Sequence, residues 1–278
     1  SFPTRRSSDL SGKWSFSIDR QDNGEKEKWF SHTLNDCINL PGSMPEKLKG
    51  DEVTAKTQWT GSLYDSSYYY NPYMEKYRKE GNIKFPFFLT PDKHYVGAAW
   101  YQKEVNIPAD WKGERILLFL ERPHIETTVW VNGQKTGMQN SLCVPHQYDI
   151  TRYVRPGKCT ITIRVDNRIK EINVGPDSHS ITDQTQGNWN GIVGRICLQT
   201  TPKTYFDDIQ IYPEPEQKLA RVKVVIKGAG ITKIKLSAES FNTDKKHIVP
   251  AIQQEIKLNK GVTETEMVLP MGNDMLLW

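Results

Sequence analysis

The stretch that decides the fold is His124-Ile-Glu-Thr-Thr-Val-Trp-Val-Asn-Gly133. In an extended chain, odd and even positions from 125 to 131 fall on opposite faces, with the valines on one face and the tryptophan on the other. Asn132-Gly133 suits the two positive-φ positions of a type I′ turn, and residues 134–138 return as the partner strand. The pattern predicts a β-hairpin whose first strand is half buried.

Further strands are expected on either side of this hairpin. Ile116-Leu-Leu-Phe-Leu120 is a continuous apolar run of strand length, and Thr160-Ile-Thr-Ile-Arg-Val165 alternates apolar and polar residues. Both need a sheet partner. Between them, residues 148–157 predict a single helical turn, which Thr151 could cap and Pro156-Gly157 would end.

A long aromatic stretch precedes the hairpin without a sustained helical or strand period. It carries Trp59, Tyr64, Tyr68, Tyr69, Tyr70, Tyr73, Tyr77, Phe85, Phe87 and Phe88. Aromatic faces stack on the apolar faces of pyranose rings, so this composition suits a saccharide surface. A long loop must also bury something to be ordered. We expect most of these rings to pack and one or two to contact sugar.

From Tyr205 the sequence changes to short alternating strands. These are expected at 209–212, 221–226, 231–237 and 262–269, with a turn at Lys227-Gly-Ala-Gly230. This pattern of short alternating strands predicts an immunoglobulin-like sandwich. Only about five strands fit before Trp278, where such a sandwich needs about seven, so we expect this domain to be truncated.

Composition excludes several classes of protein. The chain has 278 residues and a mean hydropathy of -0.63, and no apolar run approaches the ~20 residues that span a bilayer. Its net charge of +4 is not gathered into a lysine or arginine block, so we expect neither a membrane nor a nucleic-acid partner. Its four cysteines (Cys37, Cys143, Cys159 and Cys197) lack metal-site or redox spacing, which favours four buried free thiols.

Several motifs together resemble one known family. They are Ser11-Gly-Lys-Trp-Ser-Phe16, Trp100-Tyr-Gln-Lys103, Val129-Trp-Val-Asn-Gly133, Tyr148-Asp-Ile-Thr151 and Ile163-Arg-Val-Asp166. They resemble the N-terminal sugar-binding domain of glycoside hydrolase family 2, which includes β-galactosidases, β-glucuronidases and β-mannosidases. Cys159 departs from the asparagine that is common there. The resemblance implies an all-β chain, with a jelly-roll (galactose-binding-like) sandwich over 11–203 and an incomplete immunoglobulin-like sandwich over 204–278.

The first ten residues stand outside this resemblance. Ser1-Phe-Pro-Thr-Arg-Arg-Ser-Ser-Asp-Leu10 resembles the translation of a common DNA-sequencing library adapter. We expect residues 1–10 to be an artefact and disordered, with the true N-terminus absent from the sequence. An export signal would then be missing as well, and a periplasmic or secreted location is favoured by the family.

The resemblance places the chemistry elsewhere. Retaining glycosidases use two carboxylates about 5 to 5.5 Å apart, and in this family both are glutamates on a (β/α)8 barrel that follows the immunoglobulin-like domain. We find no barrel pattern, and therefore expect no catalytic residue, cofactor or metal site in this chain. The expected function is an N-terminal fragment of an exo-glycosidase that is inactive alone. The alternative is a stand-alone, non-catalytic carbohydrate-binding protein.

The expected partners are a terminal β-linked sugar and the missing barrel, and homo-oligomers are allowed. In some members, loops of this domain reach the barrel mouth and contact the terminal sugar. The matching positions are His94, where asparagine is usual, and Asp183, Asn188 and Asn190. The alternative is that these residues only satisfy backbone groups of their loops. A second polar group (Glu121, Arg122, His124 and Glu126) is expected to form ion pairs, without chemistry.

Overall fold

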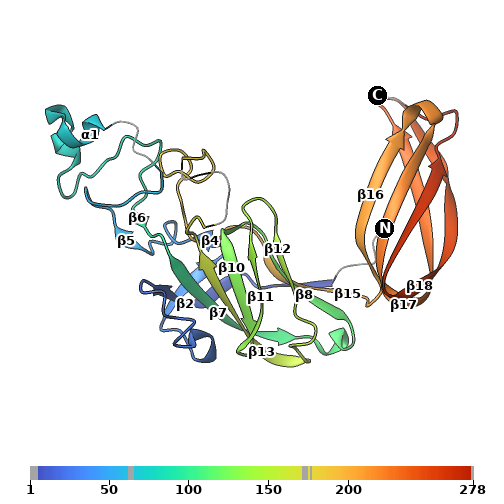
Figure 1. Cartoon of the computed structure of the whole chain (residues 1–278), viewed down its shortest axis with the longest axis horizontal. Helices are drawn as coiled ribbons and strands as arrows, with labels where there is room; N and C mark the ends of the chain where they lie inside the picture. Colours follow the sequence, from blue (N-terminus) through green and yellow to red (C-terminus); the bar gives the residue numbers. More distant parts are fainter. Residues whose placement is uncertain (1–5, 62–65, 171–174, 176, 277–278) are drawn as a thin grey trace. The chain divides into compact units, whose positions relative to one another are not determined.

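The computed structural model describes residues 6–61, 66–170, 175 and 177–276. The chain divides into two compact units, residues 1–200 and 201–278, close to the boundary expected at residue 203. Strands dominate both units, which confirms the all-β class (Figure 1). No helix in the described ranges is long and apolar enough to cross a membrane.

The first unit is built from short and medium strands. They are β1 (Arg6–Asp9), β2 (Gly12–Asp19), β3 (Asp36–Leu40), β4 (Gly42–Ser43), β5 (Asp51–Glu52), β6 (Lys93–His94), β7 (Ala98–Ile107), β8 (Arg115–Leu120), β9 (Pro123–His124), β10 (Glu126–Val131), β11 (Gln134–Asn140), β12 (His146–Asp149), β13 (Gly157–Asp166), β14 (Gly191–Ile192) and β15 (Ile196–Thr201). Its short helical elements are α1 (Ser67–Tyr70) and the 3-10 turns η1 (Trp29–Ser31), η2 (Pro72–Tyr77) and η3 (Ala109–Trp111).

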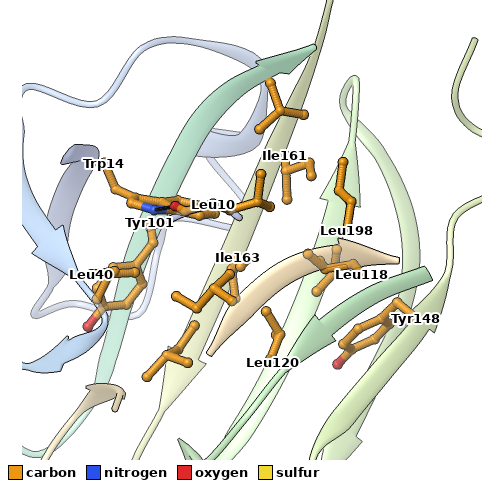
Figure 2. Packing of buried hydrophobic residues seen from close by; sticks show 14 of the residues in the cluster. Leu10, Trp14, Leu40, Tyr101, Leu118, Leu120, Tyr148, Ile161, Ile163 and Leu198 are labelled. Carbon is orange, nitrogen blue, oxygen red and sulfur yellow. Dashed lines mark hydrogen bonds between the residues drawn. The ribbon is translucent and has the colours of Figure 1, made fainter. Parts of the chain in front are cut away.

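Two antiparallel sheets form the sandwich of the first unit. One has the order β1-β15-β8-β12 and the other the order β11-β10-β13-β7-β2-β3. Leu118 and Leu120 from the first sheet share one buried cluster with Tyr101 and Ile163 from the second (Figure 2). The core therefore lies between the sheets, where the alternating apolar residues of each strand meet.

The hairpin that the sequence predicted is present. β10 pairs with β11, and Asn132 and Gly133 have φ of 49° and 76°, as a type I′ turn requires. The prediction of a half-buried strand is wrong, because every residue of β10 is buried. Trp130 on its outer face stacks on Phe30 at 5.2 Å, so the loop that carries η1 covers this side of the sheet.

Residues 6–10 belong to the fold. The expectation of disorder over residues 1–10 is wrong for this part, since β1 pairs with β15 and Leu10 is buried in the core. Trp14 Nε1 also donates a hydrogen bond to the Leu10 carbonyl at 2.9 Å. The edge of β15 offers free backbone partners and Leu10 adds an apolar anchor, which together outweigh the polar composition. Residues 1–5 lie outside the described residues.

The segment expected to begin a helical turn at Tyr148 is a strand instead. β12 pairs with β8, which buries Tyr148 against the core, and only residues 150–153 then form a turn. Thr151 Oγ1 accepts a hydrogen bond from the Ile116 backbone at 2.9 Å, so this side chain ties the turn to β8 rather than capping a helix. Burial of the apolar side chains decided between the two conformations.

The cysteine prediction holds for half of the set. Cys159 and Cys197 are buried, whereas Cys37 and Cys143 are exposed, and all four are free thiols. Burial raises the pKa of the Cys159 thiol to about 11, which keeps it protonated at neutral pH.

The second unit is a three-stranded antiparallel sheet in the part that is described. Its order is β16-β17-β18, with β16 (Tyr205–Glu214), η4 (Pro215–Gln217), β17 (Leu219–Phe241) and β18 (Lys246–Pro270). The turn expected at Lys227–Gly230 is wrong: β17 runs through it, with only a register shift between Gly228 and Gly230. One face buries Val222, Val224, Ile226, Ile234, Ile256, Leu258 and Met267. The immunoglobulin-like class of this unit stays a prediction.

Candidate functional site

The four side chains expected to bind sugar lie at one end of the first unit. His94 is on β6, which pairs with β5, while the other three lie in the loop that ends at β14. β14 fits between β4 and β9. Gly191 makes this possible: its φ is 142°, and a Cβ there would lie 2.5 Å from the Gly42 carbonyl oxygen. The loop is therefore held against the strands by close backbone contact.

Asp183 is buried and uses both carboxylate oxygens within the chain. Its Oδ2 accepts a hydrogen bond from the Thr60 backbone at 2.7 Å, and its Oδ1 accepts one from the Asn188 backbone, also at 2.7 Å. The Asp183 backbone N–H donates in turn to the Thr60 carbonyl at 3.0 Å. Burial raises the pKa of this carboxyl above its ordinary value, and the nearby His94 opposes that effect.

His94 approaches Asp183 from the opposite side of the same junction. Its Nε2 lies 3.2 Å from the Gln58 carbonyl, so this nitrogen carries the proton and donates it. The same nitrogen lies 3.9 Å from Asp183 Oδ2, and the ring packs at 4.6 Å on Trp59. The fold therefore brings together two predicted residues that are far apart in sequence.

Asn188 links the loop to His124, which the sequence placed in a group expected to form ion pairs. Its Nδ2 donates to Thr60 Oγ1 at 2.8 Å and to the Asn167 carbonyl at 3.1 Å, and its Oδ1 accepts from His124 Nε2 at 3.2 Å. The His124 ring stacks on Trp189 at 4.5 Å. Burial lowers the pKa of His124 to about 4, so it is neutral and donates one hydrogen bond here.

Asn190 fastens the end of the loop to the centre of the larger sheet. Its Nδ2 donates to the carbonyls of Gly97 and Val165, both at 2.9 Å, and its Oδ1 accepts from the Tyr101 hydroxyl at 2.7 Å. Asn167, which the sequence reading missed, accepts from the Gly97 N–H at 2.8 Å. Asn167 directly follows the motif Ile163-Arg-Val-Asp166, and this position could have indicated it from the sequence.

The four side chains thus form one buried junction in which each has partners inside the chain. His94, Asp183, Asn188 and Asn190 are all buried. Their hydrogen bonds join β6 to Gln58, Thr60 to the loop before β14, and that loop to β7 and β13. In this arrangement they satisfy backbone groups of the loops, as the alternative expectation stated. Contact with a sugar stays a prediction.

Two cavities lie beside this junction. One of about 480 Å³ is lined by His94 and by polar residues that include Arg20, Asp51 and Gln58. The other, of about 1,090 Å³, lies between residues 52–56 and 78–92. Both include the segment from Glu52 to Lys56, which therefore borders the two spaces.

The aromatic stretch both packs and reaches solvent. Trp59, Phe85 and Phe87 lie within 5.6 Å of one another, ring centre to ring centre, and Tyr68 packs on Phe85 at 4.6 Å. The exposed rings are Tyr69, Tyr70, Tyr73 and Phe88, while Tyr64 lies outside the described residues. Figure 1 shows α1, β5 and β6 together at one end of this unit.

A separate cluster of carboxylates is neutralised by basic side chains. Arg164 pairs with Asp22 at 2.7 Å, with Asp166 at 3.1 Å and with Glu126 at 3.4 Å. Arg168 and Lys170 add further pairs to the same acids. Although burial alone would raise it, these cations hold the pKa of Asp166 far below its ordinary value, so this carboxyl cannot serve as a proton donor.

The two glutamates of the polar group around residue 121 form ion pairs, but with basic residues outside that group. Glu121 Oε2 accepts from the Arg195 side chain at 3.1 Å, and Glu126 pairs with Lys170 at 2.9 Å. Within the described ranges, no three His, Cys, Asp or Glu side chains are grouped so that they could hold a metal ion.

Two packed antiparallel sheets with a polar junction at the loop end define the first unit as a β-sandwich domain of the jelly-roll kind. The family model of the sugar binding domain of glycosyl hydrolases family 2 matches residues 7–202. The chain therefore belongs to glycosyl hydrolases family 2. The match begins within the first ten residues, which the sequence reading had set apart from the family.

The curated relatives and solved structures that this chain is similar to include several β-glucuronidases. The chain is 25% identical to the β-glucuronidase of Homo sapiens, over 84% of this chain and 35% of that enzyme. It is 27% identical to the β-glucuronidase of Paenibacillus borealis, over 75% of this chain and 31% of that enzyme. A β-glucuronidase structure from an uncultured Clostridium species covers 97% of this chain and 40% of its own, with a TM-score of 0.59 and 19% identity. The chain thus spans about a third of the length of its curated relatives.

Proposed function

We propose that this chain is the N-terminal part of a family 2 exo-β-glucuronidase that removes a terminal β-linked glucuronic acid. The observation that carries the proposal is the extent of the likeness. Structures of β-glucuronidases cover nearly all of this chain, yet the chain covers only about 40% of theirs. The two units would then hold substrate and support a catalytic domain that the remaining part supplies.

The chemistry of this reaction needs two carboxylates across one glycosidic bond. The resemblance places them on a barrel that follows the second unit. In the first unit, the acids of the Arg164 cluster are held by cations, and Asp183 uses both oxygens for backbone N–H groups. These carboxylates are therefore better suited to hold the fold than to transfer a proton.

The junction around His94 is the part of this chain that we propose to lie nearest the sugar. His94 lines the cavity of about 480 Å³, whereas Asp183, Asn188 and Asn190 hold the loop behind it. A hydroxyl or carboxylate of the sugar would meet the His94 side of the cavity. The other three act as positioning residues in this arrangement.

The test is to read the natural coding sequence past residue 278 and to express the complete protein. Chromogenic β-glucuronide, β-galactoside and β-mannoside are then compared. We expect preferential cleavage of the glucuronide. Preference for another sugar would contradict the substrate, and a stop codon directly after Trp278 would instead support a stand-alone carbohydrate-binding protein.

The role of His94 is tested in the same complete enzyme. Substituting His94→Gln removes the imidazole but keeps an N–H donor for Gln58, and His32→Gln changes an exposed histidine as the control. We expect His94→Gln to raise KM for the glucuronide, with thermal stability retained, and His32→Gln to change neither. Equal kinetics for the two variants would leave His94 with a purely structural role.

A further inference from the structure

The larger cavity of the first unit has the size of a ligand site. It measures about 1,090 Å³ and lies between the segment from Glu52 to Lys56 and the segment from Arg78 to Asp92. Pockets that bind small molecules typically measure about 300–1,000 Å³. The space is distinct from the one that His94 lines, although both share the segment from Glu52 to Lys56.

Aromatic rings form one part of its lining. Phe85 is buried against Trp59, whereas Phe88 is 80% exposed and lines the cavity. Phe87 lies between these extremes and packs on Trp59 at 5.0 Å. An exposed ring beside a supported aromatic cluster offers a flat apolar face, which is what the apolar face of a pyranose ring stacks on.

Polar side chains of both signs form the rest of the lining. Lys56 and Lys84 supply donors, Glu80 and Asp92 supply acceptors, and none of the four forms an ion pair with another described residue. Neighbouring sugar hydroxyls both donate and accept, so mixed donors and acceptors suit them. Because positive and negative groups balance, the lining lacks the single-sign field that attracts a polyanion.

The walls of the cavity are fixed by hydrogen bonds from outside it. The Phe88 backbone N–H donates to the Gln184 carbonyl at 3.3 Å, and the Tyr68 hydroxyl donates to the Tyr77 carbonyl at 3.0 Å. Arg78 turns its guanidinium toward the Tyr68 carbonyl. A site that is held in place before binding loses less conformational entropy when a ligand enters.

We propose that this cavity is an accessory binding site for a neutral oligosaccharide, stacked on Phe88 and hydrogen-bonded by the charged rim of Lys56, Glu80, Lys84 and Asp92. The site needs neither hydrolysis nor a catalytic domain, so it stands independently of the proposed enzymatic function. It would hold a sugar chain at a place separate from the His94 cavity.

The experiment titrates the 278-residue chain with a neutral β-linked glucose hexamer and with a uronic-acid hexamer, followed by calorimetry. Phe88→Ala is compared with Tyr73→Ala, which removes an 85% exposed ring that does not line the cavity. We expect the neutral hexamer to bind and Phe88→Ala to weaken it about three- to tenfold, as the loss of one aromatic stacking contact implies. Tyr73→Ala should leave affinity unchanged, and both variants should keep the melting temperature.

Three results would overturn the proposal. One is the absence of binding of the neutral hexamer at millimolar concentration by a folded chain. Another is an equal loss of affinity in both variants, which would place the contact outside the cavity. The last is binding of the uronic-acid hexamer alone that added salt abolishes, since this would indicate unspecific charge attraction. None of these depends on whether the complete protein cleaves a glucuronide, so the two proposals fail separately.

Discussion

The hydroxyl of Tyr101 at the centre of the larger sheet donates a hydrogen bond to Asn190 Oδ1 at 2.7 Å, and both residues are buried. The same amide donates to the carbonyls of Gly97 and Val165. One side chain therefore satisfies three buried polar groups, one on β7, one on β13 and one at Gly97 directly before β7. Burial also raises the pKa of Tyr101 well above its ordinary value, so the hydroxyl stays protonated and remains a donor.

We expect Asn190→Ala to destabilise the first unit by about 3 kcal/mol. The substitution removes the acceptor of the buried Tyr101 hydroxyl and one donor from each of the Gly97 and Val165 carbonyls. An unpaired buried group costs about 1–3 kcal/mol, and each lost hydrogen bond adds about 1 kcal/mol. Urea denaturation measures the loss, with Asn39→Ala as the control because Asn39 is exposed on β3. Equal midpoints for the two variants would show that water replaces all three bonds.

The hairpin turn gives a second prediction. Asn132 combines a positive φ with a side-chain bond, since its Oδ1 accepts from the Thr160 backbone at 2.9 Å. Asn132→Ala removes the hydrogen bond and places a residue that disfavours positive φ in the turn, so it should lower the free energy of unfolding by about 2–3 kcal/mol. Asn132→Gly keeps the conformation and loses only the bond, so it should cost about 1 kcal/mol. Chemical denaturation of the two variants separates strain from hydrogen bonding.

The outcome that would contradict this reading is an equal effect of the two Asn132 substitutions. It would mean that strain at the turn contributes nothing. Gly133→Ala checks the point from the neighbouring position, where φ is 76° and the nearest other atom to an added Cβ lies 4.0 Å away. Its expected cost of about 1–2 kcal/mol would come from backbone strain, because no contact is made worse.

The strands of the sandwich could be predicted because their side chains alternate with a period of two. The chain shows this clearly in residues 125–131 and 160–165, and residues 126–131 and 160–165 are strand in the structure. Alternation cannot reveal whether a distant segment also packs on the outer face of a strand. Trp130 lies on the face opposite the valines, which the expectation of a half-buried strand left open, yet the loop around Phe30 packs on it. That contact joins residues 100 positions apart, and no local pattern encodes it.

The site was predicted only in part, for a similar reason. The resemblance located His94 and Asp183, and the fold brings His94 Nε2 to 3.9 Å from Asp183 Oδ2. It did not reveal that Asp183 would be surrounded by backbone donors, because Thr60 comes from a loop whose path the sequence does not specify. His124 was missed as a partner of Asn188 because its local neighbours suggested ion pairs instead.

Acid should weaken the junction through His124. Its folded pKa of about 4 lies below its ordinary value of 6.5, so the unfolded chain binds a proton in this range that the folded chain does not. The contribution is complete above about pH 6.5 and is lost as the pH falls toward 4, by up to about 3 kcal/mol. The raised pKa of Asp183 has the opposite effect, because it favours the folded state as the pH falls. This effect is the same in every variant that keeps Asp183.

Comparing His124→Gln with the unchanged chain isolates this effect, because Asp183 is present in both. Gln keeps an N–H donor for Asn188 and removes the titration. We expect unfolding free energy measured from pH 7 to pH 4 to fall less steeply in the variant. His32→Gln, at an exposed position, should follow the unchanged chain. Parallel curves for all three proteins would show that His124 does not titrate in this window.

We expect the loss of one cation from the Arg164 cluster to lower the free energy of unfolding substantially. Asp166 is fully buried, and Arg164 also pairs with Asp22 and Glu126. Arg164→Met should cost about 3 kcal/mol, since Arg168 and Lys170 then face three carboxylates and one buried negative charge of the cluster is left uncompensated. Lys158→Met, which breaks an exposed pair with Glu104, should cost less than about 1 kcal/mol. Thermal unfolding of both variants compares them, and similar melting temperatures would contradict the argument.

The last prediction is that the 278-residue chain by itself releases no chromophore from a β-glucuronide. Cleavage needs one carboxyl that donates a proton and one that attacks. Asp22, Glu126 and Asp166 meet around Arg164, but cations hold the pKa of Asp22 and that of Asp166 below their ordinary values. Asp183 has a raised pKa, as a proton donor would, yet both its oxygens accept backbone N–H groups.

The assay therefore tests one carboxylate of the Arg164 cluster and the buried carboxylate of Asp183. The purified chain is incubated with chromogenic β-glucuronide beside the variants Glu126→Gln and Asp183→Asn, with the complete enzyme as the positive control. We expect the chain and both variants to match the rate of buffer alone. Turnover by the unchanged chain that either substitution abolishes, while the folded state persists by circular dichroism, would place catalysis in the sandwich. Turnover that survives both substitutions would point to a contaminating enzyme, because neither candidate acid would then be needed.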